Sequence, residues 1–396
     1  MEQNELRTPC YIIHEKQLTS NLSDFQEAVG QVNRRGIVGY SFKTNSTPCI
    51  LKLVKRCGCY AEVVSGMEFS LAEKMGFPYE NIIYNGPIKS EETFFIAYMN
   101  NAIINIDSTN ELEWLKRAIV SKKSRGIGLR VNFDLDKELS GSTITGSEGG
   151  RFGFSVETGD LHRVIGFCQD DLGVPVIGLH MHVSTKAKST EVYRKLSDIA
   201  GRIAEQEQLQ LKYIDIGGGF FGGGDHGKAY REYVFAIREG LMVHGIDNIT
   251  LIVEPGASVV ATAVDYLTKV VSRKDTSHGR FVIMDGSRLH IDPFMHRTKQ
   301  TYSLYADSEE CFDSQILCGY TCMENDRLMK LEGEQELQTG DKVLFHTVGS
   351  YTMCFNSNFI EGMPYIYLEK DGAYYMVRDK WQIDECLQKN VVGFGT

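Results

Sequence analysis

Residues 37–45 read IVGYSFKTN, a short apolar segment that runs directly into Lys43 with no turn residue between them. Such a run predicts a buried β-strand, and a lysine at the end of a buried strand is costly unless the site uses it. One use is as an uncharged amine that bonds covalently to a carbonyl group. The alternative is a lysine that extends from the strand end into solvent, which is the commoner arrangement for a lysine seen alone. The rest of the chain has to decide between the two.

The composition limits the possible partners of this chain. Its 396 residues are enough for two domains, or for one large barrel with an appendage. The net charge of −10 argues against a nucleic-acid or anionic-membrane partner, because both require a basic surface. No apolar run reaches the ~18 residues of a membrane span, and the start MEQNELRTPCYII lacks a signal-peptide core. Ten cysteines at scattered spacings indicate reduced thiols, so we expect a cytoplasmic protein.

Apolar, strand-like runs alternate with amphipathic segments through the first two thirds of the chain. Such alternation indicates parallel βαβ units, and eight of them fit a closed (β/α)8 barrel of ~250 residues. An open doubly wound sheet would normally have its Gly-rich turn after the first strand, where this chain has Lys43. The eight runs are Ile37–Phe42, Tyr60–Val64, Ile82–Tyr84, Ala102–Ile106, Ile127–Val131, Val176–Met181, Tyr213–Ile216 and Leu251–Val253.

The pattern changes after about residue 266. Short apolar runs such as Phe281–Met284 and Lys342–His346 are separated there by turn residues instead of long helices. They predict an antiparallel β-domain, which a strand near residues 9–14 joins from the N-terminus. The expected fold is therefore α/β, with a (β/α)8 TIM barrel over residues 19–266. Residues 1–18 and 267–396 form the C-terminal antiparallel β-domain.

His180 and His182 lie two apart on a predicted strand, so they face the same side of it. Three interpretations stay open, which are a metal pair, core histidines bonded to their neighbours, and a ring that stacks on an aromatic ligand. No carboxylate or third histidine accompanies the pair in a recognisable pattern, so we predict no metal.

Two further strands end in groups that can hold a cofactor. Gly217, Gly218 and Gly219 follow one strand, and exposed backbone amides there can bind a phosphate. Glu254 follows another, and its buried carboxylate needs a partner such as a protonated pyridine nitrogen. A lysine amine, a stacking ring, a phosphate nest and a carboxylate for a pyridinium are together what pyridoxal phosphate requires.

In order along almost the whole chain, these motifs resemble those of the fold-type III pyridoxal-phosphate decarboxylases, the group that contains diaminopimelate and ornithine decarboxylases. The similar segments are YSFKTN, AEVVSGMEF (61–69), NGPIKS (85–90), RFGF (151–154), HMHVST (180–185), YIDIGGGF (213–220), LIVEPGAS (251–258), GYTCMEND (319–326) and GSYTMCFNSNF (349–359). The resemblance implies an alanine-racemase-like barrel, pyridoxal 5'-phosphate bound to Lys43, and loss of CO2 from the α-carbon of an amino acid.

The resemblance also implies a role for individual residues. His182 would stack on the cofactor ring, and Cys322 would donate a proton to the α-carbon. The segment of Cys322 would reach the active site of the partner subunit in a head-to-tail homodimer. The implied cofactor-binding residues are Lys43, Glu62, His182, Thr185, Gly217, Gly218, Gly219, Glu254, Gly256 and Tyr351.

The chain departs from the family at positions that concern the substrate and the phosphate. Ala257 stands where E-P-G-R has an arginine. Asp292 stands where diaminopimelate decarboxylases have an arginine for the distal carboxylate, so it would favour an ammonium unless His296 or Arg297 substitutes. We therefore expect a basic or modified amino acid, similar to diaminopimelate, ornithine or lysine, with Asp292, His296, Arg297 and Glu324 around it.

Two other functions stay open at this point. The first is racemisation at the α-carbon, although racemases of this fold have an arginine where this chain has Glu254. The second is a non-catalytic homologue that acts as a binding partner. The absence of an arginine at Ala257 motivates it, and the retention of Lys43, His182, Glu254, Cys322 and Tyr351 argues against it.

Overall fold

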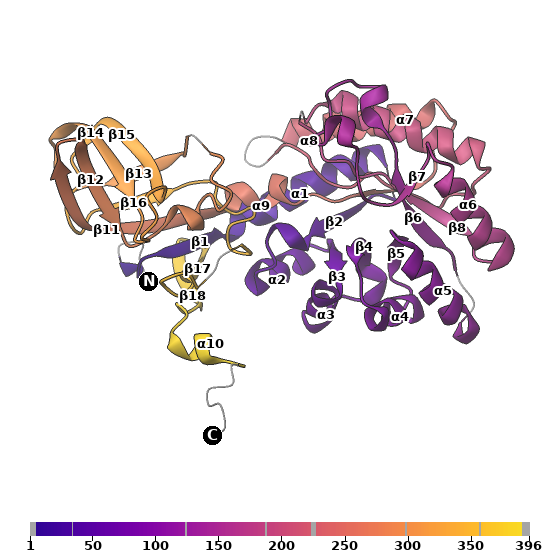
Figure 1. Cartoon of the computed structure of the whole chain (residues 1–396), viewed down its shortest axis with the longest axis horizontal. Helices are drawn as coiled ribbons and strands as arrows, with labels where there is room; N and C mark the ends of the chain where they lie inside the picture. The colour runs from indigo at the N-terminus through magenta and orange to yellow at the C-terminus, as the bar shows by residue number, and fades with distance from the viewer. Residues whose placement is uncertain are drawn as a thin grey trace. The chain divides into compact units, whose positions relative to one another are not determined.

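The computed structural model describes residues 5–33, 35–122, 125–186, 188–222, 227–297, 299–355 and 358–389 (Figure 1). The chain forms two compact units. One comprises Thr19–Val259, and the other combines Met1–Leu18 with Val260–Thr396. The second unit begins slightly before residue 267 because strand β11 (Val264–Thr276) is continuous within its sheet. In the part of the chain that is described, no helix is long and apolar enough to cross a membrane.

The first unit is a closed barrel of parallel strands, as the sequence predicts. The strand order is β5-β4-β3-β2-β10-β9-β8-β6, and a β5–β6 pairing closes the circle. The short strand β7 pairs with β6 outside this order. The strands are β2 (Ile37–Ser41), β3 (Tyr60–Ser65), β4 (Ile82–Ile88), β5 (Ile103–Ile106), β6 (Ile127–Asn132), β7 (Phe154–Ser155), β8 (Val176–His180), β9 (Tyr213–Asp215) and β10 (Thr250–Val253).

Helices follow the barrel strands closely, because capping residues come directly after several strand ends. Ser65 ends β3, and its hydroxyl accepts a hydrogen bond from the Glu68 amide. Ser90 accepts in the same way from the Thr93 amide after β4. The helices are α1 (Glu15–Val32), α2 (Pro48–Arg56), α3 (Gly66–Lys74), α4 (Glu91–Met99), α5 (Thr109–Ser121), α6 (Asp160–Gly166), α7 (Thr190–Gln206), α8 (Gly227–Met242) and α9 (Ala257–Val260).

Tyr213 lies in the barrel interior, where its ring leaves no room for a side chain at two neighbouring glycines. The side chain of Tyr213 packs with Ile83 and Ile252. A Cβ on Gly178 would lie 2.0 Å from Cζ of Tyr213, and one on Gly128 would lie 2.1 Å from its hydroxyl. Both distances are far below van der Waals contact, so the ring depends on the two glycines for its place.

The second unit is a mixed sheet, in which most strand pairs are antiparallel, as the sequence predicts, and two pairs are parallel. Strand β1 (Cys10–His14) runs antiparallel to β11 but parallel to β17 (Tyr365–Lys370). Strand β12 (Gly279–Met284) is parallel to β14 (Cys311–Cys318). No hairpin joins either parallel pair, so no tight turn forces the two strands to run in opposite directions. The remaining elements are β13 (Tyr302–Tyr305), β15 (Arg327–Gln335), β16 (Lys342–Phe345), β18 (Ala373–Arg378) and α10 (Ile383–Leu387).

The packing around Tyr213 gives a test of stability. Gly178→Ala should lower the free energy of unfolding by about 1–3 kcal/mol, because the added methyl group overpacks the barrel interior. The control is Gly30→Ala in α1, where nothing lies within 4 Å of an added Cβ. This control should gain about 0.5–1 kcal/mol from the better helix propensity of alanine. Urea unfolding measures both values, and equal stabilities would contradict the packing described for Tyr213.

Candidate active site

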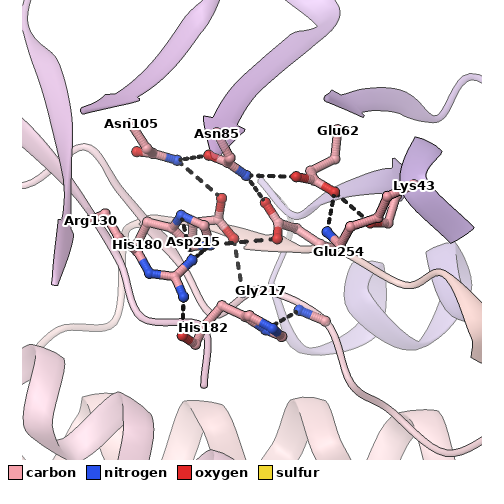
Figure 2. Close-up of polar contacts among 12 residues, drawn as sticks. Lys43, Glu62, Asn85, Asn105, Arg130, His180, His182, Asp215, Gly217 and Glu254 are labelled. Carbon is pink, nitrogen blue, oxygen red and sulfur yellow. Dashed lines mark hydrogen bonds and ion pairs between the residues drawn. The ribbon is translucent and has the colours of Figure 1, made fainter. Parts of the chain in front are cut away.

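Lys43 lies directly after β2, at the carboxyl end of the barrel strands, in the position that the sequence predicts (Figure 2). Its Nζ is 3.1 Å from Oε2 of Glu62 on β3. The side chain of Lys43 is 41% exposed, whereas that of Glu62 is 1% exposed. The strand pattern suggested a buried lysine, but the side chain of Lys43 is partly exposed. Its amine is paired with a buried carboxylate and is accessible to a ligand.

Glu62 accepts hydrogen bonds from two further side chains. The Ser41 hydroxyl donates to Oε2 at 2.5 Å, and Nδ2 of Asn85 donates to Oε1 at 3.1 Å. Three donors, including Lys43, thus surround this carboxylate. Three such hydrogen bonds hold the carboxylate in one orientation.

A second buried carboxylate, that of Glu254, lies at the end of β10. Nδ2 of Asn85 donates to its Oε1 at 2.5 Å, and Nε2 of His180 is 3.5 Å from its Oε2. Asp215 on β9 is hydrogen-bonded to Glu254, and burial together with this neighbour raises the pKa of Asp215 well above its usual value. Asp215 therefore keeps its proton more readily than an exposed aspartate does, and its partner is Glu254.

Arg130 on β6 organises the two histidines. Its guanidinium contacts both ring nitrogens of His180, at 3.1 and 3.3 Å, and donates to the backbone carbonyl of His182. Burial and the positive charge of Arg130 lower the pKa of both histidines well below the usual value, so both rings are neutral.

His182 has a fixed ring orientation. Its Nδ1 accepts from the amide of Gly218 at 3.2 Å, so the neutral ring has its proton on Nε2. The rings of His180 and His182 are 6.4 Å apart and inclined by 30°. His180 is thus a hydrogen-bonded core residue, whereas the neutral ring of His182 lies just after the end of its strand.

The structure corrects one argument about metals. The sequence shows no carboxylate near the histidine pair, but donor atoms of His180, Asp215 and Glu254 lie within 4.8 Å of one another. The guanidinium of Arg130 lies against the same histidine, and its positive charge opposes a cation there. That the chain uses no metal therefore stays a prediction. It now rests on the positive charge of Arg130 and no longer on the spacing of residues in the sequence.

The glycines beside His182 leave room that a side chain would fill. A Cβ on Gly217 would lie 2.3 Å from Cβ of His182, and one on Gly218 would lie 2.4 Å from the Glu254 carbonyl oxygen. Gly217 and Gly219 have φ angles of 75° and 88°, which glycine adopts without strain. The amides of Gly217 and Gly218 donate to Asp215 and His182 respectively. Two of the three amides predicted to bind phosphate are thus directed to protein groups.

Gly256 is a further point of close approach, since a Cβ there would lie 2.1 Å from Oγ1 of Thr44. Thr185, predicted as a phosphate ligand, forms an isolated bridge with Thr143. Ser258 follows Gly256 and Ala257, and its buried hydroxyl has no hydrogen-bond partner among the described residues. The donor set of lysine, neutral histidine, carboxylate and glycine loops fits a phosphorylated pyridine aldehyde.

The other predicted site residues belong to the second unit. Cys322 is an exposed free thiol. Tyr351 has a φ of 58°, and its ring packs near Phe294 and Phe355. Glu324 is exposed. Residues 356–357 of the motif around Tyr351 lie outside the described residues.

The carboxylate of Asp292 is occupied within its own segment. It forms an ion pair with Arg288 at 2.8 Å and accepts from the amides of His296 and Arg297 at 3.2 and 2.9 Å. The guanidinium of Arg297 donates to Gln300 and to the Thr347 carbonyl. Because Arg288 neutralises Asp292, the argument that this carboxylate would repel a distal carboxylate of the substrate loses its physical basis.

Sequence reasoning missed several residues of the barrel site, namely Ser41, Asn85, Asn105, Arg130 and Asp215. Arg130 and Asp215 carried a signal that could have revealed them, because each interrupts a buried apolar strand with a charge. Asn85 and Asn105 carry no charge, so neither has a comparable signal. Asn85 follows a predicted strand, where asparagine is also an ordinary turn residue, and Asn105 lies within the apolar run of residues 102–106.

A family model described as "Pyridoxal-dependent decarboxylase, pyridoxal binding domain" matches residues 15–261, which is more than half of the chain. The chain belongs to this family. Its cofactor is therefore pyridoxal phosphate, and its reaction is the pyridoxal-dependent decarboxylation of an amino acid.

Relatives and solved structures agree with the family and the fold. A probable chloroplastic diaminopimelate decarboxylase of Oryza sativa is 28% identical, over 96% of this chain and 79% of the relative. The diaminopimelate decarboxylase of Methanocaldococcus jannaschii is 24% identical over 97% and 91%. A crystal structure of that enzyme has a TM-score of 0.86, with 98% of this chain and 93% of the other covered at 24% identity. An arginine decarboxylase of Paramecium bursaria Chlorella virus bound to agmatine has a TM-score of 0.74 at 20% identity, over 90% and 94%.

Glu68 lies near the site and titrates in an accessible range. Its side chain accepts a hydrogen bond from the Val64 amide at 2.8 Å. Burial, and to a smaller extent the nearby charge of Glu62, raises the pKa of Glu68 to about 7. The native state therefore keeps a proton on Glu68 that the unfolded chain releases near pH 4.5.

This shift predicts how stability depends on pH. Wild-type stability should lose a contribution from Glu68 as the pH rises from about 4.5 to about 7, and Glu68→Gln should remove this loss. Glu68→Gln should thus gain stability over the wild type as pH rises through this range. Glu113→Gln, at an exposed position of α5, is the control and should follow the wild-type slope. Urea unfolding at a series of pH values measures the free energy of unfolding of each protein. If this free energy had the same pH dependence in all three proteins, the raised pKa of Glu68 would be contradicted.

Proposed function

We propose that the chain releases the α-carboxylate as CO2 from an amino acid that carries a second amino group, with Lys43 as the residue that bonds to the cofactor. The observation that carries the proposal is the pairing of Lys43 Nζ with the buried Glu62 carboxylate at 3.1 Å. The lysine is half exposed beside Glu254, His182 and the glycine loops, so its amine is both accessible and next to a base.

Each neighbouring residue then has a role in holding the cofactor. Glu254 would accept the hydrogen bond of the pyridine nitrogen, and the neutral ring of His182 would lie against the pyridine face. Gly217–Gly219 and Gly256 would leave room for the phosphate, together with Thr185 and Tyr351. The bound cofactor supplies an electron sink for the charge that remains on the α-carbon when CO2 leaves. The Glu62 carboxylate would orient the amine of Lys43.

Cys322 is proposed to return a proton to the α-carbon. Its thiol is exposed, as a residue that completes a neighbouring site must be before assembly. We propose a cytoplasmic homodimer in which the segment around Cys322, with Glu324, reaches the barrel of the partner. The resemblance of GYTCMEND to the family motif supports this arrangement.

The substrate class rests on the relatives and on the neutralised Asp292. The relatives are named for diaminopimelate, and one structural neighbour is an arginine decarboxylase bound to agmatine, so the named substrates carry a second basic nitrogen. Because Arg288 pairs with Asp292, diaminopimelate is not disfavoured relative to lysine or ornithine. His296 and Arg297 are close in sequence to this pair and are proposed to face the distal end of the substrate.

The central experiment compares Lys43→Ala with the wild type. The wild type should show the visible absorbance of lysine-bound pyridoxal phosphate and release CO2 from at least one of diaminopimelate, lysine, ornithine and arginine. Lys43→Ala should lose both, with a fall of about 10³-fold or more in turnover because the covalent bond to the cofactor is gone. Lys52→Ala on α2 is the matched control and should behave as the wild type. A Lys43→Ala protein with unchanged absorbance would refute the assignment, and inversion at the α-carbon without CO2 release would indicate racemisation.

Subunit mixing tests the shared site. Lys43→Ala and Cys322→Ala should each be inactive alone, but a mixture that exchanges subunits should regain about a quarter of wild-type turnover, since half of the dimers then contain one intact site. A monomer by analytical ultracentrifugation, or no recovery after demonstrated subunit exchange, would contradict the proposed dimer.

A further inference from the structure

Asn85 lies between the two carboxylates of the site and donates to both (Figure 2). Its Nδ2 is 3.1 Å from Oε1 of Glu62 and 2.5 Å from Oε1 of Glu254. An amide nitrogen has two hydrogens, so one is available for each carboxylate. Asn85 itself is 2% exposed, so water does not compete for these bonds.

The orientation of the Asn85 amide is set by a second asparagine behind it. Oδ1 of Asn85 accepts from Nδ2 of Asn105 at 2.8 Å, and this nitrogen is also 3.3 Å from Oδ2 of Asp215. If the Asn85 amide were reversed, its oxygen would face the oxygens of Glu62 and Glu254, and its nitrogen would face the nitrogen of Asn105. Both contacts are repulsive, so only one orientation is compatible with the neighbours.

Tyr213 fixes the orientation of Asn105 in turn. Its hydroxyl donates to Oδ1 of Asn105 at 2.8 Å. The ring cannot move aside, because Gly128 and Gly178 lie against it so closely that neither has room for a Cβ. The three residues therefore form one directed chain, in which every link donates toward the carboxylates. It begins at the packed tyrosine within the barrel and ends at Glu254 and Glu62.

We propose that Asn85 is a positioning residue for the cofactor, and that Asn105 and Tyr213 hold it in the orientation that keeps Glu254 and Glu62 as hydrogen-bond acceptors. This inference deepens the proposed function, because it rests on Glu254 as the partner of the pyridine nitrogen. The donor on Oε1 of Glu254 holds this carboxylate in the orientation in which it would face the pyridine nitrogen. A donor on Glu62 fixes the group that faces Lys43.

A structural role alone would make a different prediction from a positioning role. Deleting a buried hydroxyl leaves its hydrogen-bond partner unpaired and destabilises the fold wherever the hydroxyl lies. Only a positioning role connects the Tyr213 hydroxyl, which touches no predicted cofactor ligand, to the spectrum and retention of the cofactor. The measurement must therefore read the cofactor and not turnover alone.

The test compares Tyr213→Phe with Tyr98→Phe, since each deletes one buried tyrosine hydroxyl and keeps its ring. The hydroxyl of Tyr98 donates to the Lys122 carbonyl, apart from the site, so it is a matched control. Titration of each apo-protein with pyridoxal phosphate should give a dissociation constant about tenfold higher for Tyr213→Phe, and less than about twofold higher for Tyr98→Phe. The pH midpoint of the visible absorbance should shift in Tyr213→Phe only.

Asn85→Leu should weaken cofactor binding further than Tyr213→Phe, because both carboxylates lose a donor. If Asn85→Leu does not fold, Tyr213→Phe decides the question by itself. Unchanged cofactor affinity and pH midpoint in Tyr213→Phe, with a loss of thermal stability like that of Tyr98→Phe, would overturn the inference and leave a structural role. Failure of the wild type to bind pyridoxal phosphate at Lys43 would instead refute the proposed function.

Discussion

The site depends on one electrostatic constraint, which is that two carboxylates are buried at the same end of a barrel. Glu62 and Glu254 are 1% and 3% exposed, and each would be costly without compensating donors. Lys43 and Ser41 donate hydrogen bonds to Glu62, and Asn85 donates to both carboxylates. The guanidinium of Arg130 adds a positive charge on the far side of His180. Most of the other features of the site follow from this requirement.

The compensation also determines protonation states. Arg130 is buried among carboxylates, and its charge together with burial keeps His180 and His182 neutral. Asp215 keeps its proton more readily than an exposed aspartate does, because burial and Glu254 raise the pKa of that carboxyl. The site thus offers a flat neutral ring, a buried carboxylate and an accessible amine in one place. That combination is suited to a cofactor with an aldehyde, a pyridine ring and a phosphate.

The fold and the residues at strand ends could be predicted from sequence because both depend on local patterns. Apolar runs that alternate with amphipathic segments located the barrel strands, and Lys43 and Glu254 could be recognised as charged residues directly after such runs. The mixed sheet could not be predicted, since the pairing of β1 with β17 joins segments from opposite ends of the chain. The Tyr213–Asn105–Asn85 chain was also hidden, because it depends on which side chains of three separate strands meet inside the barrel. The engagement of Asp292 by Arg288 likewise depends on side-chain geometry that a motif comparison does not contain.

The most direct test of the account is to locate the covalent attachment of the cofactor. Reduction of the pyridoxal-phosphate-loaded protein with borohydride makes the bond permanent, and digestion followed by mass spectrometry identifies the modified residue. The account predicts one modified lysine in the barrel, Lys43, in the peptide that contains YSFKTN. Modification of a different lysine, such as the buried Lys89 that pairs with Glu111, or the absence of any modified lysine, would contradict it.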